Sequence, residues 1–215
     1  MKTSHSDREI MDFRELNKVL GNTDLLLMDQ ILRGKFLPGM RMLDAGCGEG
    51  RNMVYFIKNG FSIYGIDMDP GAVSLARLTA GTISKKYVAE NIFQSSIEEN
   101  SFPDEFFDMT ICINVLHLAR DMDHFFNMLA ALARILKKSG LLFMVMEQEL
   151  LPGTDKKTTV IEGKRGPEAG KRFYLTKELL TRIKSWKKLE KTGESRTYQI
   201  EDKVSLSGCW FRKIQ

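Results

Sequence analysis

The chain has 215 residues, of which 43% are hydrophobic and 28% are charged. This composition excludes disordered, fibrous and membrane-embedded classes and predicts one domain with a sizeable core, because a chain of this length buries roughly 70% of its unfolded surface. The net charge of +4 is unevenly divided, since residues 1–150 hold 16 Lys/Arg and 20 Asp/Glu, whereas residues 151–215 hold 16 and 8.

The N-terminal part of the chain predicts a helical cap over residues 1–36, where apolar residues recur at helical spacing. From residue 37 onward, short apolar runs alternate with amphipathic stretches. Runs of this kind are typical of strands that are covered on both faces. They predict strands at residues 40–45, 61–67, within 87–95, at 107–114 and at 141–146.

Three amphipathic stretches between these runs predict helices. One covers residues 53–58 and stops at Asn59-Gly60. Another begins at Asp69-Pro70, because an Asp cap accepts orphan backbone N–H groups and Pro is tolerated in the first turn. The third runs from Phe125 through Leu136 and ends at residues 137–140, with basic residues in the last turn. The apolar residues expected on the second helix are Val73, Leu75, Ala76 and Leu78.

The pattern changes after Glu147. Residues 148–170 are polar and hold four glycines and two prolines, and residues 148–175 are predicted as a surface excursion near the acceptor site. Residues 176–186 predict a helix with Thr176 as its cap, and residues 189–199 and 203–214 predict two strands. The short connection between these strands predicts an antiparallel pair. The alternating order over the whole chain, 1–215, predicts one Rossmann-like α/β domain, a three-layer α/β/α sandwich with a mostly parallel sheet.

The cysteines argue against a metal centre and against a disulfide framework. Cys47, Cys112 and Cys209 are an odd number with no CxxC or Cys/His pairing at ligand spacing. A reducing compartment fits these free thiols. Since the N-terminus has no apolar run of signal-peptide length, we expect a cytoplasmic protein with no membrane segment.

The segment with the most chemical information is Leu43-Asp44-Ala45-Gly46-Cys47-Gly48-Glu49-Gly50. Glycines between a buried strand and a helix make a tight turn and let a ligand approach the backbone. Asp67 follows at the end of the second strand, where a carboxylate can accept both hydroxyls of a ribose. Asp44 would repel a pyrophosphate but suits a cationic amino group. The pair of features therefore predicts a site for a cationic nucleoside rather than a dinucleotide.

Five motifs in order resemble those of class I S-adenosylmethionine-dependent methyltransferases. The resemblance spans about residues 40–147 and implies a seven-stranded sheet whose last strand is antiparallel, with S-adenosylmethionine as cofactor and S-adenosylhomocysteine as product. Segments 22–25 and 172–176 are also similar to small bacterial members of the tellurite-resistance type. The motifs are the glycine segment, Tyr64-Gly65-Ile66-Asp67-Met68-Asp69, Phe102-Pro103-Asp104-Glu105-Phe106-Phe107-Asp108, Asn114-Val115-Leu116-His117 and Leu136-Lys137-Lys138-Ser139-Gly140-Leu141-Leu142.

The resemblance also implies roles for individual residues. The loop residues would lie under the methionine part of the cofactor, with Asp44 meeting its amino group. Asp67 would bind the ribose, Met68 would pack on the adenine, and Ser96 with the Ile97 backbone would contact the adenine edge where the family often has an acidic residue. The cofactor-binding set is Asp44, Ala45, Gly46, Cys47, Gly48, Asp67, Met68, Ser96, Ile97, Asn114 and Leu116.

His117 is the candidate general base, because the unperturbed pKa of a histidine lies near neutrality. A sulfonium is an activated methyl donor, so a base is optional, and a packing role for His117 is an equal alternative. His124, beside Asp121-Met122-Asp123 at a helix start, is expected to be a surface or capping residue. Tyr174 and Arg172 are further candidates for the acceptor side, although packing is the simpler role for Tyr174.

The leading hypothesis is methyl transfer to a small-molecule acceptor by a monomer or homodimer, because the chain leaves no room for a separate recognition domain. The basic residues 151–215 favour either a solvated face or an anionic acceptor. They also motivate an RNA or protein methyltransferase, although the aromatic residues there fit packing better than base stacking, so we do not expect nucleic-acid binding. A non-catalytic S-adenosylmethionine-binding protein is the remaining alternative.

Overall fold

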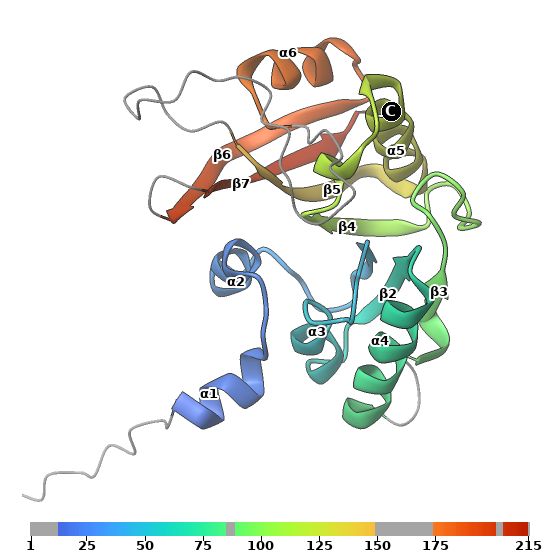
Figure 1. The fold of residues 1–215 in the computed structure, drawn as a ribbon, viewed down its shortest axis with the longest axis vertical. Coiled ribbons are helices and arrows are strands. Elements are labelled where there is room, and N and C mark those ends of the chain that lie inside the picture. Colours follow the sequence, from blue (N-terminus) through green and yellow to red (C-terminus); the bar gives the residue numbers. More distant parts are fainter. Residues whose placement is uncertain (1–12, 85–88, 149–173, 201–203, 215) are drawn as a thin grey trace, which may run out of the picture.

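The computed structural model describes residues 13–84, 89–148, 174–200 and 204–214. The central element is a seven-stranded sheet with the order β3-β2-β1-β4-β5-β7-β6 (Figure 1). Neighbouring strands from β3 to β5 are parallel, and β7 is antiparallel to both β5 and β6. The strands are β1 (Arg41–Ala45), β2 (Ser62–Asp67), β3 (Ile92–Gln94), β4 (Phe107–Ile113), β5 (Leu136–Glu147), β6 (Leu189–Ile200) and β7 (Val204–Lys213).

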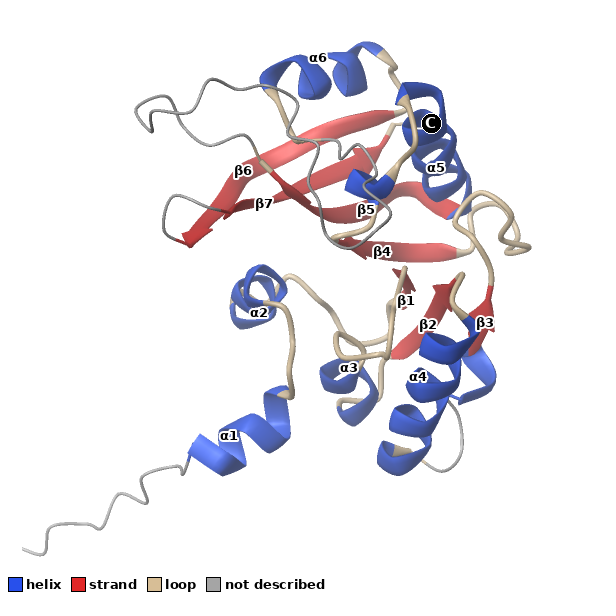
Figure 2. Cartoon of the chain, viewed as in Figure 1, coloured by secondary structure: helices blue, strands red, loops and turns tan. Residues whose placement is uncertain are grey.

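Helices cover both faces of this sheet (Figure 2), which confirms the predicted three-layer Rossmann-like fold and its antiparallel last strand. Alternate strand residues contribute to two separate apolar clusters, as the two-residue period of a strand requires. One cluster includes α5 (Met122–Ile135) and α6 (Lys177–Ser185). The other includes α2 (Leu25–Leu32), α3 (Val54–Lys58) and α4 (Pro70–Ile83). The further helical elements are α1 (Phe13–Leu20), η1 (Ala89–Asn91) and η2 (Leu116–Leu118).

Most of the predicted elements are present. Asp69 caps α4 by accepting from the Gly71 and Ala72 amides, and Thr176 caps α6 by accepting from the Leu179 amide. Two helices, α1 and α2, occupy the described part of the predicted cap, while residues 1–12 lie outside the described residues. So do the predicted turn at 201–203 and residues 149–173 of the excursion, with Arg172 among them.

The predicted end of the third helix was wrong. Helix α5 stops at Ile135, and Leu136 already pairs with Phe107 as the first residue of β5. The Phe106 amide donates to the Ile135 carbonyl at 2.8 Å, so sheet pairing takes over where local helix propensity would continue. The register then shifts before β5 continues at Leu141, and Ser139 has a φ of 60° in this irregular stretch.

The apolar face of α4 also differs from the prediction. Leu75 and Leu78 are 46% and 65% exposed, while Val73, Ala76 and Ala80 are buried. Small residues face the sheet here because Gly50 packs against Ala76: a Cβ at Gly50 would lie 3.3 Å from the Ala76 Cβ. The close approach brings α4 against the glycine loop that follows β1. No described helix has the length and apolar character needed to cross a membrane.

Candidate functional site

The glycine loop after β1 lies where the strand order reverses, since β1 has β2 on one side and β4 on the other. Open parallel sheets bind ligands at such a point, outside the carboxyl ends of the strands. The amides of Gly46 and Cys47 both donate to the Ile66 carbonyl, at 2.8 and 2.9 Å. These bonds hold the loop against the end of β2.

Gly46 and Gly48 serve different purposes in this loop. Both have a positive φ, 78° and 52°, which an L side chain rarely adopts. A Cβ at Gly46 would lie 2.3 Å from Cγ2 of Val115, so this glycine lets the loop pack against the segment after β4. A Cβ at Gly48 would meet no atom within 4 Å. The backbone at Gly48 therefore borders open space, as a ligand cradle requires.

Asp67 closes one side of the cradle. Its Oδ2 accepts from the Gly48 amide at 2.8 Å, and its Oδ1 accepts from the Asp69 amide at 3.0 Å. Each carboxylate oxygen has about two acceptor positions, so each keeps one for a further donor. The carboxylate is thus oriented by the backbone and can still accept from the two hydroxyls of a ribose.

Asp44 is the most unusual charged group of the site. Its side chain is 1% exposed, and neither carboxylate oxygen has a hydrogen-bond partner within the described part of the chain. Burial raises the pKa of Asp44 from 3.8 to about 7, Arg51 opposes this rise, and the negative charge of Asp67 adds to it. A buried carboxylate of this kind is costly unless a cation or donor completes it. It fits the cationic amino group that the sequence predicted.

Arg51 is a site residue that the sequence analysis missed. It lies 3.7 Å from Asp24, the cap of α2, whose amide donates to Asn52 at 2.9 Å. These contacts tie the start of α2 to the turn after the glycine loop. Only the fold brings residues 24 and 51 together. Val115 was missed for the same reason, because its contact with Gly46 joins two different strands.

Several predicted site residues serve mainly to pack the protein around the site. Ala45 and Leu116 are fully buried in one apolar cluster, and Cys47 is 4% exposed in the other. Burial and the nearby charges of Asp44 and Asp67 raise the pKa of the Cys47 thiol far above its usual range, so the thiol stays protonated. For these residues the side chain lies in the core, so the backbone is the part that is left for a ligand: at the start of the glycine loop for Ala45 and Cys47, and in η2 for Leu116.

Met68 has the opposite character, with a side chain that is 73% exposed directly after Asp67. The loop after β3 begins close by, because the Ser95 amide donates to the Asp67 carbonyl at 2.9 Å. Ser96 and Ile97 follow in that loop. An exposed apolar side chain beside a ribose-binding carboxylate is suited to stack against a flat base.

The segment after β4 carries the other predicted residues. Asn114 has a φ of 61°, and its amide donates to the Val145 carbonyl at 2.9 Å. Its Oδ1 is buried without a hydrogen-bond partner within the described residues. Such strain and an open acceptor position are common at functional sites. His117 lies in η2 and is 5% exposed, so its ring is nearly enclosed by the protein.

Both ends of the predicted excursion meet at the carboxyl end of β5. Gln148 forms a bridge with Leu175, and the Leu175 amide donates to the Glu147 carbonyl at 2.8 Å. Tyr174 is half-buried at this junction. The chain therefore leaves and re-enters the described fold at the same edge of the sheet that carries the glycine loop.

His124 was expected to be a surface or capping residue, and its contacts at the start of α5 fit the capping alternative. Its amide donates to Asp121, the cap of α5, but its ring is only 17% exposed and is hydrogen-bonded to Glu98. Within the described residues, no group of three or more His, Cys, Asp or Glu side chains could hold a metal ion.

A family model matches the part of the chain that carries the glycine loop and Asp67. Residues 43–144 match a family model described as "Methyltransferase domain". A ubiquinone biosynthesis O-methyltransferase from Hahella chejuensis is 32% identical over 127 residues, which are 59% of this chain and 51% of that protein. The match thus spans about half the length of this relative.

Solved structures share the fold over a larger part of the chain. An S-adenosylmethionine-dependent methyltransferase from Methanosarcina mazei has a TM-score of 0.66 at 21% identity, covering 86% of this chain and 97% of that one. Magnesium protoporphyrin IX methyltransferase from Synechocystis, solved with S-adenosylhomocysteine, has a TM-score of 0.65 at 15% identity, covering 95% and 89%. At these identities the likeness concerns the fold.

Proposed function

Since residues 43–144 form a domain of the methyltransferase family and the sheet has the class I S-adenosylmethionine-dependent methyltransferase fold, we propose that this protein transfers a methyl group from S-adenosylmethionine to a small-molecule acceptor. The observation that carries the proposal is the buried Asp44 carboxylate, which has no partner within the described residues and lies beside the Gly48 cradle. Asp44 would bind the amino group, Gly46 and Gly48 would border the methionine part, and Asp67 would accept from the ribose.

The cofactor's sulfonium supplies an activated methyl group, and the protein supplies position and surroundings. Bringing nucleophile and methyl carbon into line can contribute about 7 kcal/mol or more. The residues suited to the acceptor side are Asn114 and His117, at the carboxyl end of β4, with the Gln148–Leu175 bridge at the end of the neighbouring β5. The positive φ of Asn114 aims its backbone out of the strand direction at this point.

We propose a small acceptor for two reasons. The described chain is one sheet with its helices, and the O-methyltransferase relative acts, by its name, in the biosynthesis of a small molecule. An anionic acceptor stays a prediction. It would depend on basic residues near the excursion, where Lys177 begins α6.

Cofactor binding tests the proposal. S-adenosylhomocysteine at about 100 times its Kd should stabilise the fold by about 2.7 kcal/mol, which raises the Tm by roughly 5–10 °C in a domain of this size. NAD at the same concentration should have no effect. Stabilisation by NAD and none by either S-adenosyl compound would show that the glycine loop serves a different ligand. Release of S-adenosylhomocysteine in a screen of small acceptors then tests turnover.

A variant of His117 tests the proposed base. His117→Ala should bind S-adenosylhomocysteine as the wild type does and lower kcat by about 100-fold or more, if the acceptor must lose a proton. The measurement is kcat across pH with the acceptor found in the screen. Unchanged turnover in His117→Ala would remove the base role and leave a packing role for this 5% exposed ring. Asn114→Ala is the comparison variant, since it removes a different side chain of the same segment.

A further inference from the structure

The loop from β3 to β4 is held by the protein at both of its ends. At its start, the Ser95 amide donates to the carbonyl of Asp67 at 2.9 Å. At its end, Arg134 of α5 donates to the Phe102 carbonyl and to Asp104, both at 2.7 Å, and to the Asn100 side chain at 3.0 Å. Residues 96–99 lie between these two anchors.

Internal hydrogen bonds use part of what residues 96–99 offer. The Ser96 hydroxyl accepts from the Glu99 amide at 3.2 Å, and the Ile97 carbonyl accepts from the Asn100 side chain at 2.6 Å. The Ser96 hydroxyl keeps its own hydrogen and one acceptor position. The Ile97 side chain is 5% exposed and belongs to the core, so its backbone is the part that remains for a ligand.

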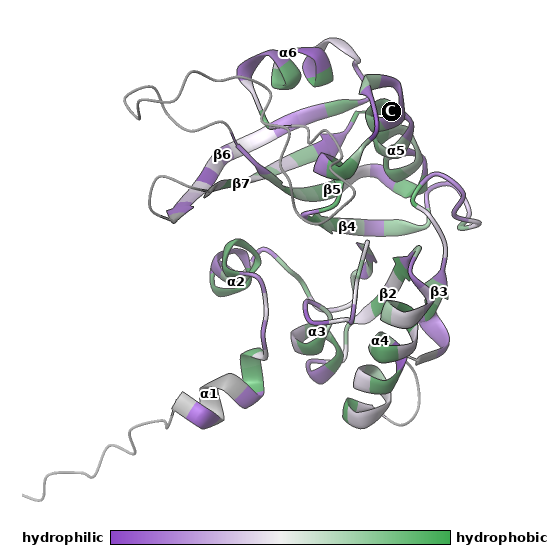
Figure 3. Cartoon of the chain, viewed as in Figure 1, coloured by the Kyte–Doolittle hydropathy of each residue, from purple (hydrophilic) through white to green (hydrophobic). Residues whose placement is uncertain are grey.

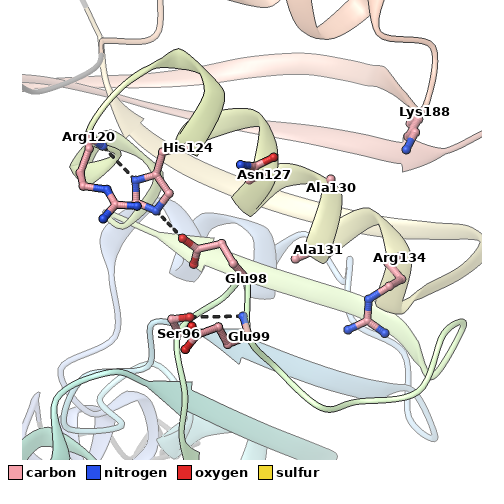
Figure 4. A pocket seen from close by; sticks show the side chains of 10 residues that line it. All are labelled: Ser96, Glu98, Glu99, Arg120, His124, Asn127, Ala130, Ala131, Arg134 and Lys188. Carbon is pink, nitrogen blue, oxygen red and sulfur yellow. Dashed lines mark hydrogen bonds and ion pairs between the residues drawn. The ribbon is translucent and has the colours of Figure 1, made fainter.

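A side-chain hydrogen bond connects this short stretch to α5, in addition to the apolar cluster that Ile97 shares with that helix. Nε2 of His124 is hydrogen-bonded to Oε1 of Glu98, and Nδ1 of His124 accepts from the Arg120 amide at 3.0 Å (Figure 4). Because Nδ1 accepts, a neutral ring carries its proton on Nε2 and donates it to Glu98. The side chains are 17% and 26% exposed, so water competes weakly for this bond.

The His124 ring is itself fixed by its own helix. Asp121 caps α5 and accepts from the His124 amide at 2.7 Å, and the Arg120 amide approaches the ring from the preceding turn. Figure 4 shows Glu98 reaching from the loop toward this ring, with Ser96 and Glu99 next to it. A rigid group on α5 therefore sets the position of the stretch that contains Ser96.

We propose that His124, acting through Glu98, is a positioning residue that holds Ser96 and the Ile97 amide against the adenine of the cofactor. This inference rests on the proposed function, because it concerns the same cofactor site. His124 and Glu98 do not bind the cofactor themselves. They reduce the conformational freedom of residues 96–99 before the cofactor binds. Less of the free energy of adenine binding is then spent on ordering the loop.

The test compares two nucleosides that differ only at that edge. S-adenosylhomocysteine carries the 6-amino group, and S-inosylhomocysteine carries an oxygen there. Isothermal titration gives the Kd of both for the wild type, His124→Ala, Glu98→Ala and the double variant. Asn127→Ala is the matched control, since Asn127 follows His124 on α5 and lines the same pocket as Ser96, Glu98 and His124, and within the described residues no hydrogen bond joins it to the loop.

We expect His124→Ala and Glu98→Ala each to weaken S-adenosylhomocysteine binding about tenfold, the value of one hydrogen bond to a charged group. The double variant should be no weaker than either single variant, because both remove the same contact. The preference for the adenine over the hypoxanthine compound should fall in all three. Glu98→Gln, which keeps an acceptor for His124, and Asn127→Ala should bind as the wild type does.

Equal loss of affinity for both nucleosides in His124→Ala would overturn the inference, because it would indicate a general loss of structure. Unchanged affinity in that variant would overturn it as well. Thermal melts monitored by circular dichroism identify a variant that fails to fold, in which case Glu98→Ala decides the question. If the wild type binds neither S-adenosyl compound, the proposed function itself fails, a result separate from any difference between variants.

Discussion

The buried carboxylate of Asp44 gives the site its chemical character. In the ligand-free protein its pKa is raised from 3.8 to about 7, chiefly by burial. Asp67, one strand away, is held by two amides and presents its oxygens to a ligand. The same residue type therefore has two roles, because the Asp44 carboxylate has no donor among the described residues and the Asp67 carboxylate has two.

A raised pKa in the folded state makes stability depend on pH. The contribution of Asp44 is fully present below its unfolded pKa of 3.8 and is lost as pH rises through about 7. The free energy of unfolding of the ligand-free wild type should therefore fall over this window, by at most about 4 kcal/mol from this group. Denaturant melts at pH 5 and pH 8 measure the part of this fall that lies above pH 5, and Asp44→Asn should show a smaller one. Equal falls in both proteins would mean that Asp44 ionises in the folded state as it does in water.

Cofactor binding should show the opposite pH dependence. A bound ammonium group stabilises the ionised form of Asp44, so the affinity for S-adenosylhomocysteine should increase as pH rises through about 7. Asp44→Asn should bind more weakly and lack this increase. Titrations at pH 6 and pH 8 on the two proteins separate the effect of Asp44 from that of other groups.

The two glycines of the loop should separate folding from binding. Gly46→Ala places a Cβ 2.3 Å from Val115 at a φ of 78°, so we expect a loss of stability of about 2 kcal/mol or more. Gly48→Ala meets no neighbour within 4 Å, so only about 1 kcal/mol of backbone strain is expected. Its methyl group would enter the cradle and weaken cofactor binding. The Tm and the Kd for S-adenosylhomocysteine are the two measurements. A large loss of stability in Gly48→Ala with unchanged cofactor binding would contradict the proposed cradle.

At the scale of elements, a buried hydrogen bond connects α2 to β7. Nε1 of Trp210 on β7 donates to the Gln30 side chain at 2.8 Å, and Gln30 is 3% exposed. Gly208 of β7 makes room for the Phe143 ring, since a Cβ there would lie 2.9 Å from that ring, and the Phe143 ring lies 4.8 Å from the Trp210 ring. Helix α2 is thereby fixed with its capping Asp24 beside Arg51.

Trp210→Phe should lower the free energy of unfolding by about 1–3 kcal/mol, because it leaves the buried Gln30 oxygen without its donor. Gln30→Leu combined with Trp210→Phe removes both partners and should restore part of this loss. Chemical denaturation followed by circular dichroism gives the values. Additive losses in the double variant would show that the hydrogen bond itself contributes little.

At the scale of the whole molecule, the carboxyl ends of the parallel strands carry the proposed site, whereas their amino ends carry basic residues. Strand β6 is parallel to β5, so Lys187 and Lys188, just before β6, lie at the amino ends of the parallel strands. The glycine loop lies at the opposite, carboxyl ends. Arg212, near the end of β7, also lies at the amino ends of the parallel strands. Figure 3 shows β6 itself as mostly white and purple, consistent with an exposed edge strand. Much of the described positive charge of the C-terminal region is therefore remote from the proposed methyl-transfer site.

Helix α6 allows a matched test of this separation. Lys184→Glu, in the last turn, should leave the KM of the acceptor and of S-adenosylmethionine within about twofold of the wild type, because the charge change is screened beyond a Debye length. Lys177→Glu, in the first turn near Leu175, should raise the KM of an anionic acceptor. Steady-state kinetics at 0.1 M salt give the KM values of both variants. A larger effect of Lys184→Glu would point to an acceptor that contacts the opposite edge, as an RNA would.

Local patterns were sufficient for much of this protein. Apolar runs, Asp69-Pro70 and Thr176 predicted the strands and helix starts, because a buried strand or a cap depends on neighbours in the chain. The order of strands and helices was enough for the Rossmann-like fold, since parallel strands need crossovers of one hand. The glycine loop and Asp67 were found because each lies directly at a strand end.

Contacts between distant segments were decided by the tertiary structure alone. Helix α5 ends at Ile135 because β4 pairs with the next residue, Leu136. The helix propensities of neighbouring residues give no information about this pairing. The packing of Val115 against Gly46 and the hydrogen bond between His124 and Glu98 join residues that are far apart in the sequence. Asp44 was predicted as a partner for a cation, but its raised pKa arises from complete burial, a property of packing in three dimensions. The sequence by itself determined which residues could perform the chemistry, and the tertiary structure decided their surroundings.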